Sequence, residues 1–482
     1  MSVAIFGTGY VFWKYKNEIP CDICCLIDNA PEKQGDEIAG IKIIAPNEIF
    51  YYEYSFIVIM TFAFEEIEHQ LLEMGISREK ILNYSQISFL QGTYPRICTA
   101  GEMKPFEEWL AGCEGKKTIL VVSHDFSYTG APVALMNLVM VLKSMDYAVI
   151  MAGLTDGKLV RELEKNEIDY VKELNVCFGT EWFGLMAQRF DYIVVGTLVL
   201  HKFVHRCSSL SVKILWWIHE SDRSMYDGVD LSWLTDNIKM FGAGKRVSDF
   251  FALCYKEAKI GKLFYCIPET EHALQRLDKS DDKVTFAVIG TISYRKAQDI
   301  VVDAVKKVPS QYKESFRCLM IGAFSDVEQK YCNKIQEEII NVKQIDMLGE
   351  LDQDQISQLY HNIDVLLCPS RDDPMPIVVT QAMMHRKTCI ISENVGQSEY
   401  IQHGENGLLF INGKPEELAN QMIWAIEHKE LLCRIGERSR KIYDDRFSMS
   451  VMKKNIGNIF LEWEESTHNS DISDGRSALR NE

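Results

Sequence analysis

Short apolar runs, each followed by a glycine-bearing turn and then by a helical pattern of apolar residues, recur along the chain. Three of these steps begin at 3–9 (VAIFGTG), 118–132 (TILVVSHDFSYTGAP) and 284–296 (VTFAVIGTISYRK). Such a run is typical of a buried strand, and repeated strand–turn–helix steps are typical of a parallel, doubly wound sheet. Further apolar runs lie at 191–197, 212–218, 317–322, 364–370 and 387–393. The pattern therefore predicts an α/β protein throughout.

Turn residues and charged residues gather in two places, at 98–117 and 268–283, where we expect linkers. The 482 residues suffice for about three domains, each with its own core. An amphipathic pattern near the C-terminus predicts a helix with an apolar face that can pack back across the cleft between domains. The predicted divisions are three domains at 1–97, 116–268 and 283–445, a C-terminal helix at 446–465 and a polar tail at 466–482.

Charge and composition exclude several classes of protein. The formal net charge of -17 gives a long-range field of the wrong sign for general nucleic-acid binding. No apolar stretch reaches the roughly 18 residues of a membrane-spanning helix, and the N-terminus lacks the basic region of a signal peptide. The 14 scattered cysteines are typical of free thiols in a reducing compartment. We expect a cytoplasmic protein without a transmembrane segment or a nucleic-acid partner, with contact at the inner face of the membrane left open.

The segment CPSRDDPMPIVVTQAMMHRK at 368–387 carries the most chemistry. It leaves a strand, turns through charged residues and enters a helix with Pro376 in its first turn. The N–H groups and the positive dipole end of such a helix form an anion site at the carboxyl edge of a parallel sheet, which suits a diphosphate. Asp373 and Gln381 flank this point at a spacing that suits a sugar on one side and a ribose on the other.

This segment resembles the E-x7-E motif of family 4 glycosyltransferases, which are retaining enzymes of the GT-B fold. The segment at 396–410 resembles the family's G-x-x-E-x-I-x-x-G-x-x-G-x-L pattern, and 347–370 resembles its glycine turn, helix and PS-terminated strand. The resemblance covers about 116–445. It implies two facing doubly wound Rossmann-like domains, with a further Rossmann-like domain at the N-terminus. By this resemblance the residues that bind the donor include Gly349, Leu351, Met375, Pro376, Ile377 and Gln381.

The chain departs from the family at both ends of the motif, where Asp373 and Gln381 replace two glutamates. Both side chains still accept hydrogen bonds, and Asp373 keeps its negative charge with a shorter reach. The resemblance implies a catalytic role for Asp373 beside the sugar and a ribose contact for Gln381. The alternative is structural: Asp373 merely precedes a helix, and Gln381 is an exposed helix residue.

The loop GTISYRK at 290–296 ends in two adjacent cations, Arg295 and Lys296. Family members hold the donor diphosphate with basic residues here, and a leaving diphosphate needs such stabilisation. Lys296 matches the family's lysine, whereas Thr291 stands where an arginine is common, so Arg295 is expected to replace it. The alternative is a solvated surface pair.

Two further segments complete the expected site. Gly130 and Ala131 lie in a glycine loop that enters a helix, where a missing Cβ lets backbone approach the donor, the alternative being a plain turn. The strand at 212–218 ends in His219 and Glu220, where the family often has a histidine facing the reacting sugar. The resemblance implies a catalytic role for His219 with Glu220 as a further candidate. A hydrogen-bonded core histidine is the alternative.

Two motifs have competing interpretations. Asp352 and Asp354 form a DxD that could hold a metal, but acidic residues at a helix start are the favoured interpretation. The sequence GTGYVF at 7–12, with Asp28 further on, is a partial dinucleotide fingerprint in which Phe12 stands at the third glycine. We expect neither a metal nor a cofactor.

The predicted function is transfer of a sugar from a nucleotide-sugar donor to a glycan or lipid-linked glycan, with retention and without metal. The donor would bind mainly in the third domain and the acceptor mainly in the second, in the setting of polysaccharide biosynthesis. Two alternatives stay open: a catalytically silent relative that serves as a binding or chaperone subunit, and a nucleotide-sugar epimerase.

Overall fold

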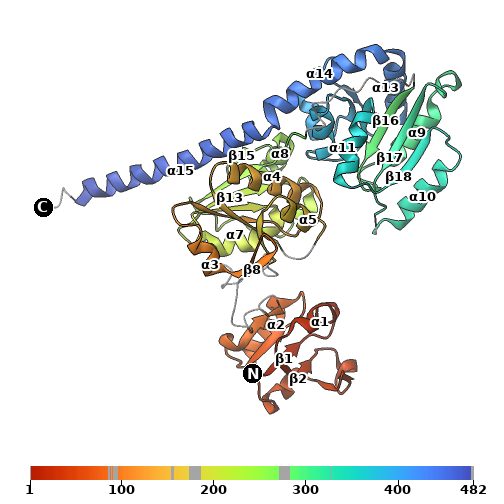
Figure 1. The fold of residues 1–482 in the computed structure, drawn as a ribbon. Helices are drawn as coiled ribbons and strands as arrows, with labels where there is room; N and C mark the ends of the chain where they lie inside the picture. The colour runs from red at the N-terminus through yellow and green to blue at the C-terminus, as the bar shows by residue number, and fades with distance from the viewer. Residues whose placement is uncertain are drawn as a thin grey trace. The chain divides into compact units, whose positions relative to one another are not determined.

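Three sheets form in the described part of the chain, all within mixed α/β structure (Figure 1). The computed structural model describes residues 2–84, 87, 90, 96–153, 157–172, 186–270, 283–325 and 327–478. The chain divides into two compact units. One comprises Met1–Tyr128, Asp146–Ile214 and Asp230–Asn237, and the other Thr129–Met145, Leu215–Val229 and Ile238–Glu482. The predicted α/β class is confirmed.

The N-terminal sheet is Rossmann-like, with the strand order β3-β4-β2-β1-β5-β6. All neighbours are parallel except the short β3, which pairs antiparallel with β4. Alternate strand residues face opposite sides: Ala4 and Phe6 enter one apolar cluster, and Val3 and Ile5 enter the other. The elements are β1 (Ser2–Phe6), α1 (Tyr10–Tyr15), β2 (Asp22–Ile27), β3 (Glu37–Ile38), β4 (Ile41–Ile44), β5 (Phe56–Ile59), α2 (Phe64–Glu73) and β6 (Ile81–Asn83).

The second sheet has nine strands in the order β15-β14-β13-β12-β9-β10-β11-β7-β8. Its strands β9, β10, β11 and β12 pair in parallel, and β7 pairs antiparallel with both β11 and β8. The strands are β7 (Arg96–Thr99), β8 (Glu102–Pro105), β9 (Thr118–Val122), β10 (Ala148–Gly153), β11 (Asp169–Lys172), β12 (Tyr192–Gly196), β13 (Lys213–Ile218), β14 (Ile238–Gly242) and β15 (Ile260–Lys262). The helices are α3 (Phe106–Ala111), α4 (Gly130–Ser144), α5 (Leu159–Lys165), α7 (His201–Ser208) and α8 (Lys245–Cys254).

The first predicted boundary, with one domain ending at 97 and the next starting at 116, differs from the structure. β7 and β8 already belong to the nine-stranded sheet, so the first sheet domain ends earlier and the second begins earlier. The turn between these strands contains Ala100 at φ 49° and Gly101 at φ 83°. Turn residues occur in hairpins as well as in linkers, and here they belong to the hairpin of β7 and β8. The other predicted boundary, 268–283, lies mostly outside the described residues.

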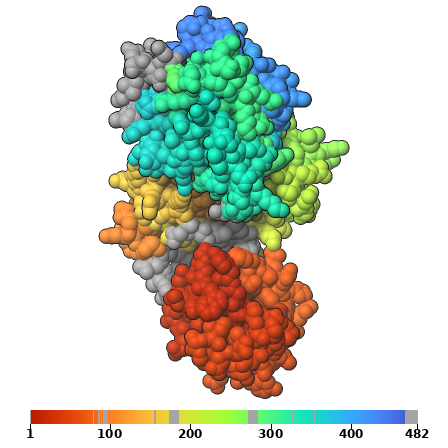
Figure 2. Space-filling model, turned by 90° about the vertical axis from the view of Figure 1, so that its right-hand side faces the viewer, coloured from red at the N-terminus to blue at the C-terminus, as the bar shows by residue number. Residues whose placement is uncertain are grey.

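The C-terminal sheet has six parallel strands in the order β18-β17-β16-β19-β20-β21. Its strands are β16 (Val284–Ile289), β17 (Phe316–Ile321), β18 (Ile345–Gly349), β19 (Val365–Cys368), β20 (Thr388–Ser392) and β21 (Leu408–Phe410). The helices are α9 (Gln298–Lys307), α10 (Gln329–Ile339), α11 (Gln353–Asn362), α12 (Ile377–Met384), α13 (Pro415–Glu427) and α14 (Lys429–Arg446). α13 packs against α9, and α12 packs against α14. In Figure 2 this part of the chain, green to blue, forms one continuous body.

The strand order of this sheet decides where its chemistry lies. From β16 the chain moves outward through β17 to β18, and β19 then returns to pair with the other side of β16. This reversal makes the β16–β19 pair the topological switch point, where parallel α/β sheets bind ligands beyond the carboxyl ends of their strands. The loops after β16 and β19 therefore meet at one place.

The chain ends in one long helix, α15 (Met449–Ala478), which packs against α4 and α14. Lys239 Nζ lies 3.0 Å from Glu462 Oε2 on this helix. The predicted helix at 446–465 thus begins three residues later and runs on into the segment predicted as a polar tail, 466–482. No proline interrupts 450–478, so the backbone can continue as a helix despite its polarity. Within the described residues no helix is long and apolar enough to cross a membrane.

Candidate functional site

The loop after β16 is shaped by glycines and a buried amide. Gly290 has φ 144°, and its N–H donates to the Ile321 carbonyl at 2.9 Å. Gly322 packs so closely that a Cβ there would stand 2.1 Å from the Gly290 oxygen, so only glycine fits. Gln298, buried at the start of α9, accepts from the Ser293 N–H and donates to the Thr291 carbonyl. These contacts fold the loop back on itself and place Arg295 and Lys296 at its end.

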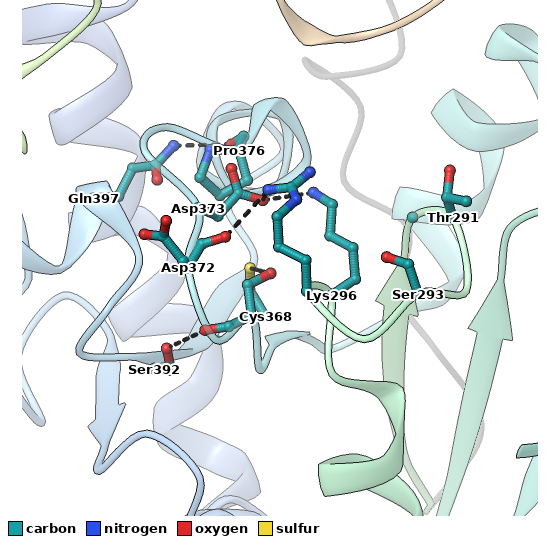
Figure 3. A network of polar contacts seen from close by, with 12 residues as sticks. Thr291, Ser293, Lys296, Cys368, Asp372, Asp373, Pro376, Ser392 and Gln397 are labelled. Carbon is teal, nitrogen blue, oxygen red and sulfur yellow. Dashed lines mark hydrogen bonds and ion pairs between the residues drawn. The ribbon is translucent and has the colours of Figure 1, made fainter. Parts of the chain in front are cut away.

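Arg295 and Lys296 both reach one carboxylate on the loop after β19, and Figure 3 shows Lys296 pointing toward it. Lys296 Nζ lies 2.6 Å from Asp373 Oδ2, and Arg295 Nη1 lies 3.2 Å from the same oxygen. Arg295 also donates to the Asp372 carbonyl at 3.1 Å. The Asp373 side chain is only 8% exposed, whereas the Arg295 side chain is 53% exposed. The loops thus assemble two cations around one nearly enclosed anion, with an excess of one positive charge.

A second ion pair joins the loop after β19 to α9, and its arginine also contacts the loop that carries Lys296. The Arg371 guanidinium contacts both carboxylate oxygens of Asp299, and it donates to the Tyr294 carbonyl at 2.6 Å. Tyr331 donates its hydroxyl to Asp299 at 2.7 Å. Burial raises the pKa of Asp299, but the hydrogen bonds from Arg371 and Tyr331 outweigh it and hold the pKa below its usual value. Arg371 therefore positions the loops through its contacts with Asp299 and Tyr294. Arg295 and Lys296 are the cations that contact Asp373.

The start of α12 is held by a buried polar network. Pro376 was predicted in the first turn of the helix, whereas it is the N-cap and Ile377 is the first helical residue. Gln397 Nε2 lies 2.9 Å from the Pro376 oxygen and 3.1 Å from Thr380 Oγ1, and Tyr265 Oη lies 2.7 Å from Thr380 Oγ1. Burial raises the pKa of the Tyr265 hydroxyl far above its usual value, so this hydroxyl stays protonated.

Gly396 packs against the loop that carries Asp373. A Cβ on Gly396 would stand 1.6 Å from the Pro374 oxygen, closer than any side chain could be. The Gly396 N–H donates to the Asp373 carbonyl at 2.9 Å. This glycine therefore lets the loop after β20 support the backbone on which the Asp373 carboxylate stands.

Gln381 lies on α12 and is 8% exposed, so the alternative in which it is an exposed helix residue is wrong. Its Oε1 lies 3.4 Å from the Tyr360 hydroxyl, which also donates to the Val378 carbonyl at 2.9 Å. The His385 ring stacks on Tyr360 with centroids 4.8 Å apart. Gln381 is thus part of a packed polar group at one side of α12.

Helix α8 contributes a residue to this region that was not among the predicted site residues. Arg246 Nη2 lies 2.5 Å from Asp372 Oδ1, and a Cβ on Gly244 would stand 2.5 Å from the Met375 methyl carbon. The segment FGAGKR at 241–246 repeats the strand–glycine–helix pattern, and this signal marks Arg246 as a further candidate residue at a helix start. Beside it lies a hollow of about 380 Å³, lined by Ser221, Arg246, Asp249, Phe250, Leu253, Glu393, Val395, Gly396, Ser398 and Glu399.

The other predicted donor residues lie on separate elements. Gly130 and Ala131 are the first residues of α4, and open space surrounds the Cβ position of Gly130. Gly349 ends β18 at φ 72°, and its carbonyl accepts from the Gly322 N–H at 2.8 Å. Leu351 follows two residues later, before α11. These four residues stand outside the ion-pair cluster.

His219 and Glu220 follow the last residue of β13, as predicted from the sequence. The His219 N–H donates to Glu220 Oε2 at 3.0 Å, and the imidazole lies against Trp217 with ring centroids 4.6 Å apart. The Glu220 carbonyl accepts from the Tyr226 hydroxyl at 2.8 Å. Both residues are partly buried at the end of a buried strand.

The two ambiguous motifs have structural partners. Asp352 caps α11, accepting from the Gln355 N–H at 2.8 Å while Gln355 Oε1 accepts from the Asp352 N–H. Asp28 accepts from the Thr8 N–H at 3.1 Å and pairs with Lys33 at 3.0 Å, so its carboxylate is bound within the protein. Among the described residues, three or more His, Cys, Asp or Glu side chains do not gather as they would to hold a metal ion.

Family comparisons match most of the chain in three segments. Residues 269–442 match the family described as glycosyl transferases group 1, and residues 115–250 match glycosyl-transferase family 4. Residues 1–82 match the family described as C2185-like, N-terminal. The first two matches cover β9 to β14 of the nine-stranded sheet and all six strands of the C-terminal sheet.

Curated relatives match over shorter stretches. An uncharacterized glycosyltransferase of Methanocaldococcus jannaschii, MJ1178, is 24% identical over 176 residues, which are 36% of this chain and 47% of the relative. The N-acetyl-alpha-D-glucosaminyl L-malate synthase of Bacillus anthracis is 28% identical over 185 residues, 38% of this chain and 46% of that enzyme. The chain thus spans less than half the length of these relatives.

Solved structures share the fold over most of the chain. The Anabaena protein Alr3699/HepE in complex with UDP and glucose gives a TM-score of 0.61 at 18% identity, covering 72% of this chain and 100% of that one. The sucrose-phosphate synthase of Thermosynechococcus elongatus gives a TM-score of 0.60 at 13% identity, covering 73% and 100%. By these family matches and this shared fold, the chain belongs to the family 4 glycosyltransferases of the GT-B fold.

Proposed function

We propose that this protein transfers a sugar from a nucleotide-sugar donor to a glycan or lipid-linked glycan acceptor. The observation that carries the proposal is the cluster of Lys296, Arg295 and Asp373 at the switch point of the C-terminal sheet. Two cations beside the N-terminus of α12 suit a diphosphate, because fixed positive charge and helix N–H groups both favour anions. The matches of residues 115–250 and 269–442 to glycosyltransferase families support the same assignment.

In the proposed reaction the bond between the sugar and the diphosphate breaks, and negative charge develops on the leaving phosphate. Lys296 and Arg295 stabilise that charge from fixed positions. Asp373 stands beside them, where a carboxylate can hold sugar hydroxyls and stabilise a ring that becomes cationic. Retention of configuration at the sugar is part of the proposal and derives from the family resemblance.

We also propose that donor binding needs no divalent metal, because cations of the protein already stand where a metal would neutralise the diphosphate. Binding of a nucleoside diphosphate is then expected to be equal with and without EDTA. If chelation abolished binding and manganese restored it, metal coordination by Asp352 and Asp354 would become the better explanation.

A second candidate function is that of a catalytically silent relative that binds a nucleotide sugar without turning it over. One observation favours it, since Asp373 is already paired with two cations. The family resemblance adds that Gln381 replaces a charged glutamate. Under this alternative the protein would serve as a binding or chaperone subunit.

The test is a thermal-shift panel of UDP-, GDP- and dTDP-sugars, followed by turnover of each donor that stabilises the protein. UDP-glucose is tested first because Alr3699/HepE has been crystallised with it. Release of nucleoside diphosphate from the wild type, and its loss in Lys296→Ala, would support transfer, and NMR of the product gives the configuration. Binding without turnover would favour the silent relative, and an epimerised nucleotide sugar would indicate an epimerase.

A further inference from the structure

The Asp373 carboxylate occupies the two cations that a diphosphate would need. Its Oδ2 oxygen lies 2.6 Å from Lys296 Nζ and 3.2 Å from Arg295 Nη1. A phosphate oxygen binds lysine and arginine through the same kind of charge-assisted contact. A diphosphate and the Asp373 carboxylate therefore compete for one pair of cations.

The burial of Asp373 makes the outcome of this competition depend on the ligand. Asp373 is 6% exposed, so it cannot turn to water when its partners are taken. A nearly enclosed carboxylate that loses its ion pairs is costly unless other donors replace them. A free nucleoside diphosphate offers no donors on the phosphate side, whereas the sugar of a nucleotide sugar brings several hydroxyl groups.

We infer that Asp373 determines the preference of this site for the nucleotide-sugar donor over the free nucleoside diphosphate that transfer leaves behind. Asp373 competes with the diphosphate of the donor and with that of the free nucleoside diphosphate. Only the donor brings sugar hydroxyls, which can donate hydrogen bonds to the carboxylate after it has lost its cations. The inference rests on the proposed function, since it concerns the same diphosphate site. Its consequence is a weakened hold on the product, so that a new donor can enter.

A neighbouring carboxylate provides a matched control. Asp372 stands one residue earlier on the same loop, but its Oδ1 oxygen pairs with Arg246. Asp372→Asn removes the same unit of charge from the same loop and keeps the backbone carbonyl that accepts from Arg295. It therefore reports the general effect of a less negative loop, whereas Asp373→Asn also releases Lys296 and Arg295.

The experiment is calorimetric titration of wild type, Asp373→Asn and Asp372→Asn with UDP, inorganic pyrophosphate and UDP-glucose at one ionic strength. Because charge-assisted contacts are freed, Asp373→Asn is expected to bind UDP and pyrophosphate roughly 10-fold more tightly than wild type. Asp372→Asn removes only a charge that solvent ions screen, so we expect its affinity for UDP and pyrophosphate to rise less than about threefold. The preference for UDP-glucose over UDP should shrink in Asp373→Asn alone.

Tighter diphosphate binding in Asp373→Asn than in Asp372→Asn supports the inference, and the thermal midpoint of each variant shows that it is folded. If the Asn variant is unfolded, Asp373→Ala takes its place. If the wild type binds UDP and the Asp373 variants bind it equally or more weakly, the inference is wrong. The proposed function is not affected by that result. If neither the wild type nor any variant binds UDP, UDP-glucose or pyrophosphate, both fail together.

Discussion

Arg371 holds Asp299 with two parallel hydrogen bonds, Nη1 to Oδ1 at 3.0 Å and Nη2 to Oδ2 at 2.6 Å. The guanidinium also stacks over the Tyr294 ring, with its central carbon 4.0 Å from the centroid. A single residue thus connects the loop after β19 to α9 and to the loop that carries Lys296. The ion pair belongs to the framework of the site, and its energetics can be measured without knowledge of the substrate.

Arg371→Lys is expected to lower the free energy of unfolding by about 1 to 3 kcal/mol, because lysine cannot make the two-pronged contact and leaves a partly buried carboxylate short of donors. Urea denaturation measures the change. The control is Lys306→Ala, which removes an exposed pair with Glu338 and should cost less than about 1 kcal/mol. If both variants lowered the free energy of unfolding by the same amount, the pair of Arg371 with Asp299 would contribute no more to stability than an exposed ion pair.

Stability is also expected to depend on pH through Asp299. Burial opposes ionisation, but hydrogen bonds from Arg371 and Tyr331 hold the pKa of Asp299 below its usual value. A carboxyl group whose pKa is lowered on folding stabilises the native state above its unfolded pKa, about 3.9, and this stabilisation is lost as the pH falls through the lower folded pKa. Urea midpoints between neutral pH and this range should fall less steeply in Asp299→Asn than in wild type. If the urea midpoint depended on pH equally in Asp299→Asn and in wild type, Asp299 would not contribute to the pH dependence of stability.

Lys296→Ala is expected to weaken donor binding by roughly 1.5 to 3 kcal/mol, the range of a charge-assisted contact. The fold should survive, because Arg295 still pairs with the Asp373 carboxylate and the lysine lies at a loop end. Calorimetry on the folded variant measures the affinity, with Lys307→Ala as a control that removes a surface pair with Glu416. An unchanged nucleotide affinity in Lys296→Ala would show that the lysine is not part of a donor site.

Asp373→Asn and Gln381→Ala are expected to affect transfer differently. Removal of the Asp373 charge should abolish turnover, because that charge acts on a ring that becomes cationic in the transition state. Loss of a Gln381 contact to the nucleoside side would be felt about equally before and during the reaction, so KM should rise with little change in kcat. Steady-state kinetics with an accepted donor separate the two outcomes. If Asp373→Asn turned over the donor at the wild-type rate, Asp373 would not be a catalytic residue.

Gly396→Ala is expected to disturb the donor site more than the rest of the fold. The new Cβ would stand 1.6 Å from the Pro374 oxygen, so the loop that carries Asp373 must shift. Weaker nucleotide binding and a lower thermal midpoint should follow. Gly9→Ala is the matched control, because a Cβ there meets no atom within 4 Å and the backbone φ of -84° suits alanine. Equal behaviour of the two variants would contradict the close packing.

The sequence alone was enough to predict the α/β class and to single out Arg295, Lys296 and Asp373. Apolar runs mark the strands, and the polar residues directly after them stand at the carboxyl edge of a parallel sheet. The roles of these residues came from a family resemblance and stay predictions. The sequence did not predict that β7 and β8 form a hairpin, because the same turn residues occur in hairpins and in linkers.

Only the tertiary structure decided which residues meet. Lys296 and Asp373 lie 77 residues apart, and Arg246 and Asp372 lie 126 apart, yet each pair forms a short ion contact. The period of apolar residues gives the face that a strand or helix buries, but it does not give the order of strands in a sheet. The pairing of β16 with β19 determines that the two loops share one place. The charges were therefore visible in the sequence, and their mutual neutralisation follows from the strand order.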